Sequence, residues 1–252
     1  MRPSAVNRLK THQKVRPWTS LLGKLLKLIA QQIEPLQLGK LFEQLQVEAA
    51  GKDPRIGAYA IEYNNPQALC FFVDIHPIFQ SLVARYPRHS TLQFLDIGPA
   101  FGAASGLIAQ MYRSDFLGPR LEVSVLDITD ERRAFIELSY PIVNFIHRPI
   151  EMLAKEQVWD LVYCSNAIEH LIDPAAFIEK VLQHTRGFAL FLAPYMEDPP
   201  LSLDHKSRIG EHLFKGFPVE QIKIFNSAAW PTTAEGLERK QILAVLRGGA
   251  AF

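Results

Sequence analysis

The stretch from Leu92 to Gly106 constrains the fold more than any other part of this chain. It begins as a short apolar run typical of a buried strand, breaks at Gly98-Pro99, and continues as an Ala-, Leu- and Ile-rich run typical of a helix. A strand, a tight turn and a helix in this order point backbone N–H groups and the positive end of the helix at whatever lies above the turn. The small residues Gly98, Ala100 and Gly102 leave room for a ligand against the backbone.

After residue 90, apolar runs alternate with helical patterns in a regular order. The apolar runs predict strands over residues 92–97, 121–126, 142–147, 158–164 and 187–192, and the segments between them predict helices over 103–113, 130–139 and from Pro174 onward. Two further β-like runs, over 219–225 and 241–247, have no long helix between them and indicate an antiparallel pair at one edge. We therefore expect an α/β fold with a Rossmann-like, mostly parallel sheet of seven strands that ends in an antiparallel C-terminal pair.

The first third of the chain has a different character. Residues 1–33 contain seven Lys or Arg and no Asp or Glu, although the whole chain has a net charge of only +1. Apolar spacing predicts helices over 20–33, 36–50 and 76–86, with Asp74 as the entry to the third helix. We place a domain boundary at residue 88, which gives a basic helical extension over residues 1–88 and an α/β domain over residues 89–252.

Composition excludes several classes of protein. No apolar run approaches the roughly 20 residues of a membrane span, and no basic groove with interleaved aromatic residues indicates a nucleic-acid partner. Cys70 and Cys164 lie in apolar runs, which predicts buried thiols and a reducing, cytoplasmic location. The sequence carries no signal for an oligomeric state.

Polar side chains gather where three of the predicted strands end. Asp96 precedes the turn over residues 98–102, Asp127 ends the second strand, and Ser165-Asn166 ends the fourth. In a parallel sheet these ends lie at one rim, where ligands of such folds bind. A carboxylate at this rim can accept hydrogen bonds from both hydroxyls of a ribose, and the turn can hold the carboxylate of a small zwitterion at a helix N-terminus. The pattern predicts a nucleoside-containing cofactor.

The glycine spacing separates the candidate cofactors. A dinucleotide fingerprint has the spacing G-x-G-x-x-G, with an acidic residue about 20 residues further on. Here the glycines are Gly98, Gly102 and Gly106, and Asp127 lies 29 residues after Gly98. This spacing disfavours an NAD-type oxidoreductase.

Three motifs in this order resemble the class I S-adenosylmethionine-dependent methyltransferases, in particular their small-molecule branch. The motifs are LDIGPAFG over residues 95–102, LDIT over residues 126–129 and WDLVYCSNAIEHLIDP over residues 159–174. The resemblance covers about residues 88–248 and leaves the N-terminal third outside. The chain departs from the family pattern at Ala100, where a third glycine is common, and at Ile150-Glu151, where an acidic residue often lies just after the third strand.

The resemblance implies S-adenosylmethionine as the cofactor and assigns its contacts. The methionine moiety would be surrounded by Asp96, Gly98, Pro99, Ala100, Phe101 and Gly102. Asp127 would hold the ribose hydroxyls and Ile128 would pack on the adenine, with Ile150 and Glu151 as further candidates beside the base. Ser165 and Asn166 would line the methyl-donor side. Without the resemblance, Asp127 is also a candidate helix N-cap and Asn166 a candidate turn residue.

The resemblance implies methyl transfer to a small-molecule or glycan-like acceptor, with residues 1–88 covering the acceptor site. The leaving group of a sulfonium is neutral, so positioning dominates the rate, and a base matters when the acceptor is a hydroxyl. The candidates for this base are His170, His205 and His212, with packed or solvated histidines as the alternative. Residues Asp204, His205, Glu211 and His212 cluster in sequence but lack a metal-ligand spacing, so we expect no metal site.

Two further alternatives stay open at this stage. The chain could bind the cofactor without catalysis, as a regulatory or scaffold protein. Its basic N-terminus predicts a helix docked on the α/β domain. Alternatively, this segment contacts an anionic membrane surface, a partner protein or a nucleic acid, or it is a transit-type peptide.

Overall fold

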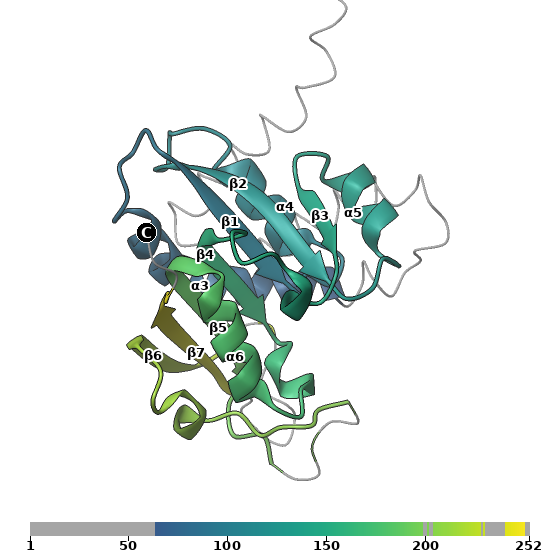
Figure 1. The fold of residues 1–252 in the computed structure, drawn as a ribbon, viewed down its shortest axis with the longest axis vertical. Helices are drawn as coiled ribbons and strands as arrows, with labels where there is room; N and C mark the ends of the chain where they lie inside the picture. Colours follow the sequence, from purple (N-terminus) through teal and green to yellow (C-terminus); the bar gives the residue numbers. More distant parts are fainter. Residues whose placement is uncertain (1–63, 199–200, 202–203, 228, 230–239, 250–252) are drawn as a thin grey trace, which may run out of the picture.

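The computed structural model describes residues 64–198, 201, 204–227, 229 and 240–249. The helices predicted over 20–33 and 36–50, and the basic segment that precedes them, lie outside these residues. The described part contains a seven-stranded sheet with the order β3-β2-β1-β4-β5-β7-β6 (Figure 1). The strands are β1 Thr91–Ile97, β2 Arg120–Asp127, β3 Asn144–His147, β4 Trp159–Ser165, β5 Thr185–Pro194, β6 Val219–Asn226 and β7 Lys240–Arg247.

The strand pairing confirms the predicted fold class. β1 pairs in parallel with β2 and with β4, β2 pairs in parallel with β3, and β4 pairs in parallel with β5. β7 inserts between β5 and β6 and is antiparallel to both. The chain builds outward from β1 through β2 to β3 and then crosses to β4 on the other side. The carboxyl ends of β1 and β4 therefore flank the switch point of the sheet, where open α/β folds bind their ligands.

Helices cover both faces of the sheet, which explains the continuous apolar runs of its parallel strands. Neighbouring residues of β1 show the division, because Phe94 packs in one core and Leu95 in the other. The first core also contains residues of α3 Asn65–Val83, α4 Ala103–Met111 and α5 Arg133–Ser139. The second contains residues of α6 Pro174–Gln183 and of the 3-10 helix η4 Ile150–Met152.

The helix predicted over residues 76–86 is wrong at both ends. The structure has α3 over Asn65–Val83, so Asp74 lies inside the helix instead of at its entry, and Pro77 is accommodated in its interior. A proline at this position removes one backbone donor and disfavours helix locally. The helix continues through it because one side is buried from Leu69 to Leu82 against the sheet. Burial therefore outweighs the local breaker signal that His76-Pro77 gives in the sequence.

Other predicted features agree with the structure. α6 begins at Pro174, and the Asp173 carboxylate caps it by accepting a hydrogen bond from Ala176 N at 3.0 Å. Cys70 and Cys164 are buried and form no disulfide, as their apolar surroundings predict. In the part of the chain that the structure describes, no helix has the length and apolar character needed to cross a membrane.

Candidate functional site

The loop between β1 and α4 has a backbone that few side chains allow. Gly98, Ala100 and Gly102 all have positive φ angles, of 68°, 51° and 77°. A Cβ atom on Gly102 would lie 3.0 Å from Cγ1 of Ile136, so packing as well as φ restricts this position to glycine. Gly102 N bonds to Pro99 O at 2.8 Å, which closes the turn directly before the first residue of α4. The loop thus places a helix N-terminus beneath an exposed Gly98.

Asp96 supports this loop from the protein interior. Its side chain is only 3% exposed, and the Ser105 hydroxyl of α4 donates a hydrogen bond to its carboxylate. Burial raises the pKa of the Asp96 carboxyl to about 7, against the opposing effect of the Ser105 hydrogen bond. The structure therefore places Asp96 as a link between β1 and α4. Its partner Ser105 was not among the predicted site residues.

Asp127 lies next to the same loop. Gly98 N donates to the carbonyl of Leu126 at 3.0 Å, which holds the end of β2 against the turn. The Asp127 carboxylate accepts a hydrogen bond from Thr129 N at 3.0 Å through one oxygen, and its other oxygen lies 3.6 Å from Arg132 Nη1. Because α5 begins only at Arg133, Asp127 forms a local turn and is not the helix N-cap considered as an alternative.

Arg132 connects the second strand end to the loop. Its guanidinium pairs with Asp127 and lies 5.2 Å from the centre of the Phe101 ring, in a cation–π contact. Arg132 was not among the predicted site residues, because an arginine in a polar turn has no distinctive pattern. Phe101 itself packs edge-on against Phe135 of α5, with ring centres 5.7 Å apart.

Two exposed apolar side chains lie beyond Asp127, at the neighbouring strand ends. Ile128 follows β2 and is 72% exposed, and Met152 ends η4, which follows β3, and is 70% exposed. β2 and β3 are paired neighbours, and Arg148 N bonds to Asp127 O at 3.0 Å. Of the candidates named beside the base, Ile150 is buried in the second core and Glu151 is exposed. Ile128 and Met152 are therefore the apolar groups available to a ligand on this side.

The end of β4 adds an amide to the same rim. Asn166 adopts a positive φ of 48°, a conformation that asparagine tolerates better than most residues. Its side chain donates to Ser165 Oγ at 3.1 Å and accepts from Nε2 of Gln241 on β7 at 3.0 Å. A Cβ atom on Gly98 would lie 3.3 Å from Cβ of Ala167, so the β4 end and the glycine loop are in contact. The fold thus brings together the three strand ends that the sequence predicts.

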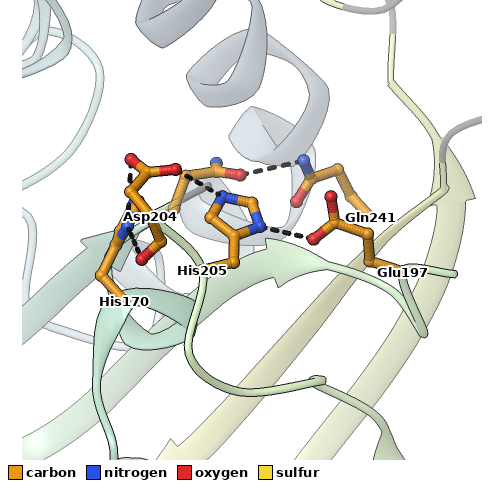
Figure 2. A network of polar contacts seen from close by, with 6 residues as sticks. His170, Glu197, Asp204, His205 and Gln241 are labelled. Carbon is orange, nitrogen blue, oxygen red and sulfur yellow. Dashed lines mark hydrogen bonds and ion pairs between the residues drawn. The ribbon is translucent and has the colours of Figure 1, made fainter. Parts of the chain in front are cut away.

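Two of the three candidate histidines meet, and one lies apart. His170 ends the 3-10 helix η5 Ile168–His170, and its ring packs edge-on against His205 with centres 4.9 Å apart. Glu197 accepts a hydrogen bond from Nδ1 of His205, and Asp204 lies beside both rings (Figure 2). His212 lies in η6 Glu211–Phe214 and is not part of the group that the ligand atoms of Glu169, His170 and His205 form among the described residues.

Glu169 completes the group of charged side chains around the two histidines. It is 2% exposed, and burial raises the pKa of its carboxyl to about 8, with Glu197 and Asp204 adding to the rise. Glu169 was not among the site residues predicted from the sequence. The one available signal was the pair Glu169-His170 directly after a strand end.

Comparison with known proteins agrees with this geometry. No protein-family model matches the chain. A curated relative, the ubiquinone biosynthesis O-methyltransferase of Rickettsia akari, is 24% identical over 155 residues; the match covers 61% of this chain and 57% of the relative. The chain thus spans little more than half the length of that relative.

Solved structures give the same fold at low identity. One is described as a sarcosine dimethylglycine methyltransferase of Galdieria sulphuraria, with a TM-score of 0.52 and 10% identity over 72% of this chain and 86% of that one. Another is the [4+2]-cyclase SpnF, with a TM-score of 0.50 and 12% identity over 69% of this chain and 81% of that one. The chain therefore has the fold of the class I S-adenosylmethionine-dependent methyltransferases.

Proposed function

We propose that this chain is an S-adenosylmethionine-dependent methyltransferase that acts on an oxygen of a small-molecule or glycan-like acceptor. One observation carries the cofactor part of the proposal. The hydrogen bond from Gly98 N to Leu126 O sets the positive-φ loop directly against the strand end that bears the Asp127 carboxylate. An adenosyl amino acid needs such a pair of sites, one for its amino-acid end and one for its ribose.

The residues present fit this cofactor. The loop at 98–102 and the N-terminus of α4 suit the methionyl carboxylate, because backbone N–H groups and the helix dipole favour an anion there. The Asp127 carboxylate suits the ribose hydroxyls, since a charged acceptor makes strong and directional hydrogen bonds. Ile128 and Met152 offer apolar surface for the adenine. Ala100 fits in place of the family's glycine because it already adopts the required positive φ.

The cofactor, when bound, supplies an electrophilic methyl group on a positively charged sulfur. In the transfer, a bond forms between the acceptor oxygen and the methyl carbon, and the electron pair of the carbon–sulfur bond stays on sulfur. The hydroxyl proton must leave as the new bond forms, so a polar group near the acceptor is required. The rim at the end of β4 meets this need, because Asn166, His170 and His205 lie there. The printed name of the Rickettsia relative, an O-methyltransferase, supports oxygen as the acceptor atom.

A binding experiment tests the cofactor assignment and a transfer assay tests the reaction. Calorimetry should show one site for S-adenosylhomocysteine and none for NAD. Release of S-adenosylhomocysteine should then be followed with labelled S-adenosylmethionine against a panel of phenols, catechols and sugars. Binding of NAD in preference to S-adenosylhomocysteine would refute the proposal.

The competing function is cofactor binding without methyl transfer. The likeness to SpnF supports this alternative, because SpnF has a similar fold and is described as a [4+2]-cyclase. Proteins of this fold therefore do not all carry out the same reaction. Under this alternative, S-adenosylhomocysteine binds but no acceptor in the panel is methylated.

A further inference from the structure

We propose that Glu169, His170 and His205 bind one divalent transition-metal ion at the end of β4. The role of that ion in catalysis rests on the proposed function, whereas its binding does not. One ligand atom from each of these residues lies within 4.8 Å of the other two. Ligand atoms about 2.0–2.2 Å from one zinc ion are separated by up to about 4 Å, so small side-chain shifts bring all three onto one ion.

The buried carboxylate of Glu169 is the observation that points to a cation. The side chain is 2% exposed, and no hydrogen-bond donor of the described residues reaches its Oε2 atom. Buried polar atoms normally have partners, because leaving one unpaired is costly. The neighbouring Glu197 and Asp204 are acidic too, so a bound cation would satisfy Oε2 and lower the repulsion among three carboxylates.

Both histidines are oriented in the way that metal ligands usually are. His205 directs Nδ1 to the Glu197 carboxylate, and His170 directs Nδ1 to the backbone carbonyl of Asp204 at 3.2 Å (Figure 2). Metal-bound histidines typically use their second ring nitrogen in this manner, which fixes the tautomer. Nε2 is then the nitrogen that would bind the ion, and in His205 this atom lies 4.0 Å from Oδ1 of Asp204. Glu197 and Asp204 would thus be positioning residues for the two imidazoles.

The backbone holds the two halves of the cluster together. Lys206 N and Ser207 N both donate to the carbonyl of Glu169, at 2.7 and 3.0 Å, and Ser207 Oγ donates to Leu171 O at 2.7 Å. These bonds fasten the loop that carries His205 to the 3-10 helix that carries Glu169 and His170. These bonds therefore fix the relative position of the two segments that carry the three ligands.

The donor set indicates the kind of ion. Two imidazoles and one carboxylate suit Zn²⁺, Mn²⁺, Fe²⁺ or Co²⁺, whereas Mg²⁺ and Ca²⁺ prefer oxygen ligands alone. Three protein ligands also leave a coordination position open, as in catalytic zinc sites. Residues 204–212 alone lack a metal-ligand spacing, so no metal site was expected from the sequence. The fold supplies the missing ligands, Glu169 and His170, from the segment after β4.

The position of this cluster gives the ion a use. Glu169 and His170 follow Asn166, the amide at the methyl-donor side of the rim, along the chain. An acceptor hydroxyl on the open coordination position would be oriented and made more acidic by the ion. Its proton would pass to solvent or to the exposed carboxylate of Asp204 as the methyl group moves from sulfur to oxygen.

Metal titration of the full-length, chelator-treated protein tests the proposal. Calorimetry with Zn²⁺ and Mn²⁺, together with the visible absorption of added Co²⁺, should show one equivalent of bound ion. Glu169→Gln and His205→Ala should each weaken binding by about 100-fold or more, and Glu197→Gln by about 10- to 100-fold. The matched control is His212→Ala, which removes a histidine that follows the same loop in η6, outside the cluster. This variant should bind the ion as the unchanged protein does.

Two further measurements separate the possible failures. Glu169→Gln preserves side-chain shape, so its thermal unfolding and its affinity for S-adenosylhomocysteine should match those of the unchanged protein. Equal metal affinity in Glu169→Gln, His205→Ala and His212→Ala would overturn the metal site, as would binding of several weak equivalents only. If the unchanged protein does not bind S-adenosylhomocysteine, the proposed function is wrong, but the metal-binding result still stands.

Discussion

Replacing the Asp127 carboxylate by an amide tests the cofactor site most directly. Asp127→Asn keeps an oxygen that can accept from Thr129 N, so the local turn is preserved. The substitution removes the negative charge, and it replaces the other oxygen, which lies 3.6 Å from Arg132 Nη1, by an NH₂ group. A ribose hydroxyl that donated to a carboxylate then meets a neutral and partly repulsive group.

The size of the effect follows from the kind of bond that is lost. A hydrogen bond to a charged group contributes about 1.5–3 kcal/mol. With about 2 kcal/mol lost and about 1.4 kcal/mol for each factor of ten, the affinity for S-adenosylhomocysteine should fall about 30-fold. The stability of the fold should change little, because the Asp127–Arg132 pair is long and Arg132 is partly exposed.

Calorimetry with S-adenosylhomocysteine, paired with urea unfolding, measures both quantities. Asp130→Asn is the control, since Asp130 is an exposed carboxylate in the same turn and should leave the affinity unchanged. If Asp127→Asn binds as tightly as the control while both variants unfold at the same urea concentration, Asp127 does not hold the ribose and our placement of the cofactor is wrong.

Three other predictions follow from the structure. In a urea titration, Gly102→Ala should lower the free energy of unfolding by about 2 kcal/mol or more, because it combines left-handed backbone strain with a Cβ contact of 3.0 Å to Ile136. Gly216→Ala is the control: its φ is also positive, but its Cβ would lie in open space, so it should cost less. Asp96→Asn should flatten the pH dependence of stability. The folded-state pKa of about 7 lies above the unfolded value near 3.8, so between these pH values the folded chain holds a proton that the unfolded chain has released. As the pH rises from about 4 to about 7, the free energy of unfolding of the unchanged protein should therefore fall by up to about 4 kcal/mol, whereas that of the variant should not. Ala100→Gly should retain S-adenosylhomocysteine binding, since φ is already +51° there, whereas Ala100→Val should weaken it by straining the loop; equal affinities for both variants would contradict the role of this backbone.

The sequence predicts the strands well and one helix poorly, for identifiable reasons. The parallel strands are buried on both faces, so their apolar runs stand out. α3 contains Pro77, and local signals break it where tertiary burial keeps it intact. Asp127 ends the second strand as predicted, but its turn with Thr129 and its pairing with Arg132 depend on where α5 begins, and that boundary has no clear sequence signal.

The polar cluster shows a second limit of sequence reasoning. His170 and His205 are both visible as candidates, yet nothing in their spacing along the chain indicates that their rings touch. The contact arises because β4 and β5 are neighbours in the sheet and the segment after β5 folds back to the carbonyl of Glu169. Only the topology brings these residues together.

The insertion of β7 between β5 and β6 has a consequence for how this polypeptide matures. During synthesis, β5 and β6 leave the ribosome before the strand that joins them, so both present unpaired edges until residues 240–247 emerge. Unpaired edges recruit other strands and promote aggregation. A nascent chain stalled before residue 240 would therefore be a client for chaperones, and release of its last strand would be the event that ends this vulnerability.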